Sequence, residues 1–300
     1  MIRATLTSLL SRKLRLVLSG LAVVLGVMFV SGAFVLTDTL GRTFDQLFNA
    51  AYADTDVEVR KAQNVEAGEF DDDERVGATI AESELTRLES VPGVASLQGV
   101  VMADGARLIG ANGKVVASVG PPRFGVDWPS QSGDVELRDG RGPTTDGEIA
   151  INAALARQAA VAVGDQVGVL SLAPKQNFTI VGIFGYPGGR DSLGGSQMVA
   201  FTTPIAQELM LGERGVYAYV DVKASGGVTN EELRDQLAAQ LGSGYDVKTG
   251  QQLAEASSES FAEALSFFNY VLIGFAFVAL FVAVFLILNT FSIIVAQRTT

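Results

Sequence analysis

The sequence of 300 residues contains no cysteine and no histidine. Their absence excludes a Cys/His zinc site, a cysteine nucleophile, and a Ser-His or Cys-His catalytic couple. Any part that folds outside the cell must do so without disulfides. We therefore predict no catalytic residue, no bound cofactor and no metal site in this chain, and no enzyme activity. A membrane-anchored hydrolase is disfavoured for the same reason, since no histidine can serve as its base.

Two segments could be mistaken for ligand sites. The acidic run from Glu66 to Glu74 could bind Ca²⁺, but it lacks the alternating ligands and central glycine of an EF-hand loop. We interpret it as a solvated loop. Gly188–Gly195 is rich in glycine, yet the chain has no phosphate-binding loop with the spacing G-x-x-x-x-G-K-[ST]. We interpret this segment as a mobile hairpin tip, and an ATPase would have to be a separate polypeptide.

Acidic residues are missing from both ends of the chain. All 33 lie between Asp38 and Glu263, together with 17 of the 22 basic residues, so this middle segment has a net charge of −16. Such a surface favours solubility and disfavours nucleic acid as a partner. The chain therefore divides into an acidic middle, residues 38–263, and two ends of different character, residues 1–37 and 264–300.

Each end contains a long uncharged run, Leu16–Thr37 and Ala264–Gln297. About 20 apolar residues in a helix suffice to cross the hydrocarbon core of a bilayer. Four basic residues precede the first run and Arg298 follows the second, and basic residues mark the cytoplasmic side. We expect two membrane spans with both termini in the cytoplasm, so that the chain is a multi-pass protein of the cell membrane with its middle outside. A cleaved signal peptide is the alternative for the first run, although that run exceeds the usual apolar region of such peptides.

Apolar residues at helical spacing continue beyond both spans, within residues 38–53 and 251–263 and up to the start of the second span. After the first span they are Leu40, Phe44 and Leu47, and before the second they are Leu253, Phe261 and Leu265. Two such stripes could bury each other as an antiparallel stalk. Alternatively, each could pack separately on its own domain.

Gly20, Gly26 and Gly32 lie in the first span at six-residue spacing. Small residues allow membrane helices to approach closely, which predicts a helix-packing face. The alternative is that glycine is simply common in such helices.

The middle segment shows mixed α and β patterns. Alternating residues predict strands over 56–60, 94–101, 178–184 and 245–248, and apolar residues at helical spacing predict helices over 81–90, 203–211 and 230–241. A β-rich block of about 120–195 is predicted as an insertion into an α/β subdomain. The predicted fold class is thus two long membrane helices that extend into a stalk, plus an α+β domain outside the membrane.

Three groups of segments resemble one known family. Residues 8–40 resemble the first membrane segment of MacB/FtsX-type ABC transporter permeases, and the final apolar run resembles the second. Residues 91–101, 147–170 and 178–185 resemble parts of their extracytoplasmic core domain. The order and spacing of the segments make the resemblance specific, although each segment alone is weak.

The resemblance implies a permease that performs no chemistry itself. A separate cytoplasmic P-loop ATPase would drive movement of the outer domain through the membrane helices, with a second permease copy or half in the complex. Substrates in the family include lipids, lipoproteins, peptides and drug-like molecules. The family has at least four spans, whereas this sequence stops at Thr300, so we expect it to be part of a longer protein. A transmembrane sensor with an outer ligand-binding domain shares the two-span topology and stays open as the alternative.

Overall fold

The computed structural model describes residues 2–62, 78–117, 122–128 and 135–296. The acidic run from Glu66 to Glu74 lies outside these residues. The chain forms two compact units, one made of Met1–Phe48 with Ala254–Thr300 and the other of Asn49–Leu253. Each unit is described by itself.

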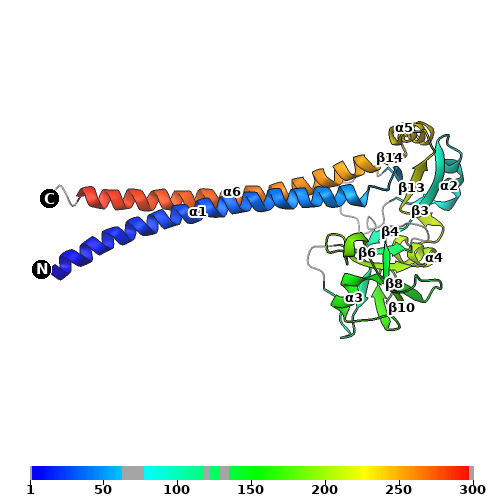
Figure 1. The fold of residues 1–300 in the computed structure, drawn as a ribbon, viewed down its shortest axis with the longest axis horizontal. Helices are drawn as coiled ribbons and strands as arrows, with labels where there is room; N and C mark the ends of the chain where they lie inside the picture. Colours follow the sequence, from blue (N-terminus) through cyan, green and yellow to red (C-terminus); the bar gives the residue numbers. More distant parts are fainter. Residues whose placement is uncertain (1, 63–77, 118–121, 129–134, 297–300) are drawn as a thin grey trace. The chain divides into compact units, whose positions relative to one another are not determined.

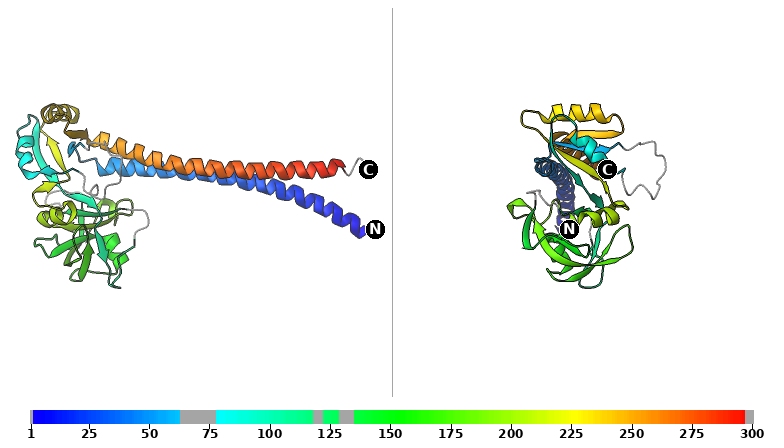
Figure 2. Two further views of the ribbon diagram at one scale, coloured as in Figure 1. Left: turned by 180° about the vertical axis from the view of Figure 1, so that it is seen from behind. Right: turned by 90° about the vertical axis from the view of Figure 1, so that its right-hand side faces the viewer.

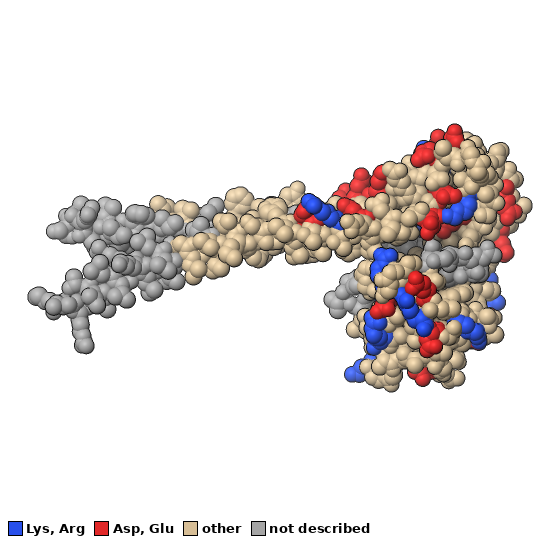
Figure 3. Space-filling model, viewed as in Figure 1, with Lys and Arg blue, Asp and Glu red and all other residues tan. Residues whose placement is uncertain are grey.

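The first unit consists of most of two long helices, α1 (Ile2–Ala51) and α6 (Gly250–Ala296), which lie side by side along much of their length (Figures 1 and 2). Neither helix contains proline, so nothing interrupts the backbone hydrogen bonds. Among the described residues, Val24–Ala51 and Gly250–Val278 are long and apolar enough to cross a membrane. At about 1.5 Å per residue, each helix is more than twice as long as the hydrocarbon core is thick. Charged side chains appear at one end of the described helix pair on the face shown in Figure 3.

The smaller sheet of the second unit is entirely antiparallel. Its strands are ordered β14 (Tyr245–Thr249), β1 (Val57–Lys61), β13 (Tyr219–Ala224) and β3 (Val94–Val100). Helices α2 (Glu82–Glu89) and α5 (Asn230–Leu241) bury one face of it. In α5, Leu233, Leu237 and Leu241 recur at four-residue spacing and are all buried against this sheet. The alternation that predicted a strand at 56–60 is thus the alternation between this core and the opposite face.

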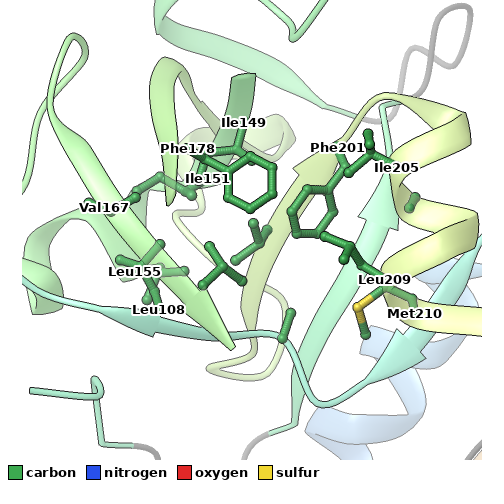
Figure 4. Close-up of a cluster of buried hydrophobic side chains, with 14 of the residues drawn as sticks. Leu108, Ile149, Ile151, Leu155, Val167, Phe178, Phe201, Ile205, Leu209 and Met210 are labelled. Atoms are coloured by element: carbon green, nitrogen blue, oxygen red, sulfur yellow. The ribbon is translucent and has the colours of Figure 1, made fainter. Parts of the chain in front are cut away.

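The larger sheet curls on itself. Its order is β4 (Met102–Asp104), β6 (Arg123–Asp127), β11 (Gln197–Phe201), β8 (Glu148–Asn152), β10 (Gln176–Gly185), β9 (Gln166–Leu170) and β5 (Arg107–Ile109), and β7 (Glu136–Gly140) also pairs with β10. The first and last strands of this order, β4 and β5, are joined by only Gly105 and Ala106. The sheet must therefore bend round until its two ends meet. Inside it lies a buried apolar cluster in which Phe178 and Phe201 pack edge to face, with ring centroids 5.4 Å apart (Figure 4).

The remaining elements are short. A two-strand ladder joins β2 (Ile80–Ala81) to β12 (Val216–Tyr217), and the short helices are α3 (Ala153–Ala159), η2 (Pro187–Gly189), α4 (Thr203–Ala206) and η3 (Gln207–Leu211). The single helix predicted over 203–211 is thus α4 followed by one π turn. The larger sheet takes its strands from residues 102–201, a wider segment than the predicted insertion of about 120–195.

The glycine-rich loop Gly188–Gly195, interpreted from its sequence as a mobile hairpin tip, is fastened to the neighbouring strand and helix. Asn152 is fully buried, and its Nδ2 donates hydrogen bonds to the carbonyl oxygens of Ser196 (2.9 Å) and Asp191 (3.3 Å). The Asp191 carboxylate also pairs with Arg157 at 2.6 Å. The glycines therefore shape a loop that is held at its centre.

Candidate functional site: the helix–sheet junction

Both long helices join the smaller sheet at neighbouring strands. Helix α1 leads to β1 after five residues, and β14 leads directly into α6. Strands β1 and β14 pair with each other, with Val57 opposite Thr249. The two helices are therefore linked through one β ladder, and we call residues 49–60, 219–224 and 245–253 the junction. All of them belong to the second unit.

No linker separates β14 from α6. The strand ends at Thr249 and the helix begins at Gly250. Thr249 and Gln252 form a reciprocal cap: the Thr249 hydroxyl accepts from the Gln252 amide at 3.3 Å, and the Gln252 Oε1 accepts from the Thr249 amide at 3.0 Å. This is the capping box of helix N-termini. It stabilises the first turn of α6 directly at the end of the strand.

The connection from α1 to β1 is instead tied down by hydrogen bonds. The Asp56 carboxylate accepts from the backbone amide of Ala224 at 2.9 Å, and the Lys223 ammonium donates to the Asp54 carbonyl oxygen. Both partners lie at the end of β13, which is an inner strand of the sheet. The end of α1 is thus anchored to a part of the sheet that is paired on both sides.

Gly250 lies where the two connections touch. A Cβ atom at this position would overlap the carbonyl oxygen of Thr55 and would lie 2.6 Å from that of Tyr52. Backbone oxygens cannot move aside as a flexible side chain can. Any larger residue would therefore push the start of α6 away from the end of α1.

The face of the smaller sheet opposite its apolar core is polar at the junction. Glu58 is only 3% exposed and lies directly across from Asp221 on β13. Arg60 forms an ion pair with Glu58, and its guanidinium lies 4.3 Å from the centre of the Tyr219 ring. A buried carboxylate needs such a partner, because burying an unpaired charge costs several kcal/mol.

The electrostatics of this cluster keep its charges fixed. Burial alone would lower the pKa of Arg60, but the hydrogen bond and charge of Glu58 outweigh this and raise it. Burial raises the pKa of Tyr219, and the negative charges of Asp221 and Glu58 raise it further. At physiological pH the arginine therefore stays charged and the tyrosine stays neutral. The cluster acts as a fixed polar contact and not as a proton switch.

Partly buried positions in the helix pair recur at an eleven-residue spacing. In α1 they include Gly26, Thr37 and Phe48, and in α6 Leu265 and Ala276 follow the fully buried Ala254 at the same spacing. An eleven-residue repeat corresponds to about 3.67 residues per turn, close to the 3.6 of a straight α-helix. The contact line, which we call the seam, can therefore follow both helices without a left-handed supercoil.

The residues predicted for the stalk fall on different sides of the helices. Phe44, Leu47, Phe261 and Leu265 are partly buried, and Leu40 is exposed. The ring centroids of Phe44 and Phe261 lie 3.9 Å apart. Leu253 is partly buried in the second unit, at the start of α6.

The three glycines predicted as a helix-packing face do not share a face. Residues six apart differ by about 240° around a helix of 3.6 residues per turn. Accordingly, Gly26 is partly buried on the seam, whereas Gly20 and Gly32 are exposed. Among the described residues, a Cβ atom at any of the three would meet no atom within 4 Å.

Sequence analysis did not single out the junction residues. The Thr249-Gly-Gln-Gln252 segment carries the capping-box pattern and could have marked the start of α6. Alternation in Val57–Arg60 placed Glu58 and Arg60 on one face. No local signal marks Gly250 or the pairing of Asp56 with Ala224, because both depend on segments nearly 170 residues or more apart in the chain.

Comparison with known protein families identifies the fold. The family model of the MacB-like periplasmic core domain matches residues 16–240. The chain belongs to this family. The MacB-like match includes most of α1 and ends within α5.

Three solved structures are similar to this MacB-like chain. The periplasmic region of MacB from Actinobacillus actinomycetemcomitans is 13% identical with a TM-score of 0.42, and the match covers 67% of this chain and 91% of that one. The extracellular domain of the noncanonic ABC-type transporter YknZ from Gram-positive bacteria is 15% identical with a TM-score of 0.39, and the match covers 64% of this chain and 99% of that one. A domain of a putative permease protein from Porphyromonas gingivalis is 17% identical with a TM-score of 0.40, and the match covers 65% of this chain and 90% of that one. No curated protein matches the chain.

Membership of the MacB-like family confirms the predicted resemblance. The chain is an ABC transporter permease component of the MacB/FtsX type. It is a membrane protein in which two apolar helices flank an extracytoplasmic α+β domain.

Proposed function

We propose that this chain is the permease subunit of an ABC transporter or mechanotransmission complex. A separate cytoplasmic ATPase supplies the energy, and the two long helices carry the resulting movement to the outer domain for export or extraction of a lipid, lipoprotein, peptide or drug-like substrate. The observation that carries the proposal is the junction. Each helix contains a candidate span and leads to one of two paired strands, β1 and β14.

The proposed topology has both termini in the cytoplasm. Its support is the absence of acidic residues from the first 37 and last 37 positions, together with the basic residues that flank the two uncharged runs. An outer domain with a net charge of −16 stays soluble and is not drawn to anionic lipid.

Contacts in the helix pair support a position for the membrane surface. Phe44 lies level with Phe261, so in an antiparallel pair Thr37 lies about level with Phe268, seven residues along each helix. Phe267, Phe268 and Tyr270 are all more than 60% exposed, as expected for aromatic side chains at a membrane surface. In this register, Leu16–Thr37 of α1 lies level with residues 268–289 of α6. We therefore assign these 22 residues of the longer second uncharged run as the second membrane span.

Beyond this surface, α1 continues for about 14 residues and α6 for about 18, roughly 21 Å and 27 Å of helix. These segments correspond to the predicted stalk. The aromatic contact among Phe44, Phe48 and Phe261 lies within them. Packed side chains keep the pair stiff, which suits it to carry displacement.

Co-purification tests the proposed partner. The full-length permease, tagged and extracted in mild detergent, should bring down a P-loop ATPase encoded by the same cell, together with a second permease copy or half. A signalling kinase or a methyl-accepting bundle on the same polypeptide would instead support the sensor alternative. A full-length protein that never associates with an ATPase would contradict the proposal.

Labelling tests the proposed topology, which the lack of cysteine in this chain makes simple. A membrane-impermeant maleimide should label a Ser243→Cys variant in intact cells. A Thr7→Cys variant should react only after lysis. Labelling of both variants in intact cells would contradict a cytoplasmic N-terminus.

A further inference from the structure

We propose that β14 is the strand through which α6 moves the outer domain, and that β1 and β13 form the fixed reference against which it moves. The inference rests on the proposed function and names the part of the junction that changes during the cycle. It follows from three differences between the ways in which α1 and α6 join the sheet.

The first difference is stiffness. The capping box between Thr249 and Gln252 joins β14 to the first turn of α6 with no linker residue between them, so a displacement of that turn acts directly on the strand. Helix α1 ends five residues before β1. That connection is held by Asp54 and Asp56 to the end of β13 and is not free to follow α1 alone.

The second difference is strand order. Within the described parts of the chain, β14 is an edge strand of the smaller sheet and pairs only with β1. Strand β1 pairs with β14 on one side and β13 on the other, and β13 pairs with β1 and β3. A shift of β14 along its axis would disturb one ladder of five residue pairs, whereas a shift of β1 would disturb two ladders.

The third difference is burial. Val57 and Val59 of β1 and Val220 and Val222 of β13 are at most 1% exposed, so the hydrophobic effect holds these two strands firmly. In β14 the apolar residues that face the same core, Tyr245 and Val247, are only partly buried. Of the two strands that join the long helices, β14 therefore has fewer strand partners and more exposed apolar residues than β1.

A limit on the movement follows from the same ladder. A slip by one residue would turn every side chain of β14 to the opposite face, exposing Val247 and burying Lys248. A slip by one residue is therefore excluded, and the proposed change is a tilt or partial separation of β14. Helix α5 packs on both β14 and β1, and residues 242–244 connect it to β14, so it covers the ladder at which the change takes place.

Two double-cysteine variants, which share the change Val59→Cys, test the inference. Val59 lies opposite Val247 of β14 and opposite Val220 of β13. Directly opposed residues of antiparallel strands have Cα atoms about 4.5–5.5 Å apart, within the range of a disulfide. The double variant Val59→Cys/Val247→Cys locks the proposed moving ladder. The control Val59→Cys/Val220→Cys locks the proposed fixed ladder in the same sheet and the same apolar core.

The readout is the ATPase rate of the complex between the full-length permease and its ATPase in lipid vesicles, measured oxidised and after dithiothreitol. We expect the β1–β14 disulfide to lower the rate about tenfold, equivalent to roughly 1.4 kcal/mol on the barrier, with recovery on reduction. The β1–β13 disulfide should leave the rate within about twofold of its own reduced form, less than 0.5 kcal/mol.

Each outcome decides between the hypotheses. An oxidised β1–β14 variant with an unchanged rate, or equal losses for both disulfides, overturns the inference about β14 and leaves the permease function intact. A wild-type permease with no ATPase overturns the proposed function itself, and the inference with it. If the reduced Val59/Val247 variant folds poorly, Glu58→Cys/Lys248→Cys places the same lock at opposed residues on the polar face of the strands and removes the buried carboxylate instead of its partner. Its oxidised and reduced rates are compared in the same way.

Discussion

The aromatic ring of Phe44 in α1 lies against the ring of Phe261 in α6, with 3.9 Å between the centroids and 26° between the planes. Phe48 contacts the Phe261 ring from the side at 6.4 Å. Beyond the area that they bury, such aromatic pairs contribute about 0.5–1.5 kcal/mol each. The contact sets the register of the helix pair, because a shift by one turn would separate the rings.

A cysteine pair at these positions should form a disulfide. With Phe44→Cys and Phe261→Cys in the full-length protein in membranes, mild oxidation should produce an intramolecular crosslink, seen as a mobility shift that reduction reverses. Glu263 is exposed and lies off the seam, so Phe44→Cys with Glu263→Cys is the matched control. Equal crosslinking of both pairs would contradict the register, and no crosslink at or within one turn of Phe44 and Phe261 would contradict the stalk.

Substitution of Gly250 should loosen the junction. In Gly250→Ala the new methyl group overlaps the carbonyl oxygens of Thr55 and Tyr52, so we expect a loss of about 1–3 kcal/mol in the free energy of unfolding of the outer domain. A Cβ at Gly244, just before β14, would meet no described atom within 4 Å, which makes Gly244→Ala the control. Denaturant unfolding of both variants in detergent is the measurement. Equal stability of the two variants would show that the close approach at Gly250 is not required.

Removal of the Asn152 amide should release the glycine-rich loop. The side chain donates to Ser196 and Asp191 and accepts from the Met198 amide at 3.1 Å. Because Asn152→Ala leaves buried backbone groups without partners, we expect a loss of about 2–4 kcal/mol and faster hydrogen exchange in residues 188–196. Asn177 is exposed on β10, so Asn177→Ala controls for the change in residue type. Unchanged exchange in the loop of Asn152→Ala would contradict this assignment.

Acid should weaken the turn that Glu148 organises. Its carboxylate pairs with Arg141 at 2.5 Å and accepts from the Thr144 amide at 2.9 Å; the hydrogen bond from Arg141 is the main reason that its pKa is lowered to about 2. A carboxyl group with a lowered pKa in the folded state stabilises that state fully above its unfolded pKa of 4.5, and the effect is lost as pH falls toward 2.

The measurement is the melting temperature of the wild type minus that of Glu148→Gln across this range. The difference should be constant from pH 7 to about pH 5 and should shrink steadily toward pH 2. Asp146→Asn, a change at a more exposed carboxylate nearby, should show a smaller difference. A difference for Glu148→Gln that is independent of pH would contradict the assigned pKa.

Local patterns predicted several elements closely. The helix predicted over 230–241 is α5, because Thr229 and Glu232 form a capping box at its start and Gly242 ends it in a conformation with φ +74°. The helix predicted over 203–211 instead ends in a π turn, which apolar spacing alone does not distinguish from an α-helix. Strand β7 was not predicted, since all five of its residues are exposed and no alternation marks it.

The glycines illustrate the limit of composition as evidence. Gly20, Gly26 and Gly32 were interpreted as one packing face because small residues often mark helix contacts, but their spacing spreads them around the helix. Phe44 and Phe261 were predicted from spacing of three and four residues, which keeps side chains on one face. Their rings are in contact, whereas Leu40, from the same predicted stripe, is exposed.

The sequence by itself determined the two long apolar runs, the acidic middle and the absence of cysteine and histidine, since each is a property of consecutive residues or of composition. Only the tertiary structure decided that β1 and β14 are neighbours, that β14 is an edge strand, and that Gly250 lies against Thr55 and Tyr52. These contacts join segments almost 200 residues apart in the chain. Strand pairing at such separations depends on how whole elements bury their apolar faces together, which no local pattern specifies.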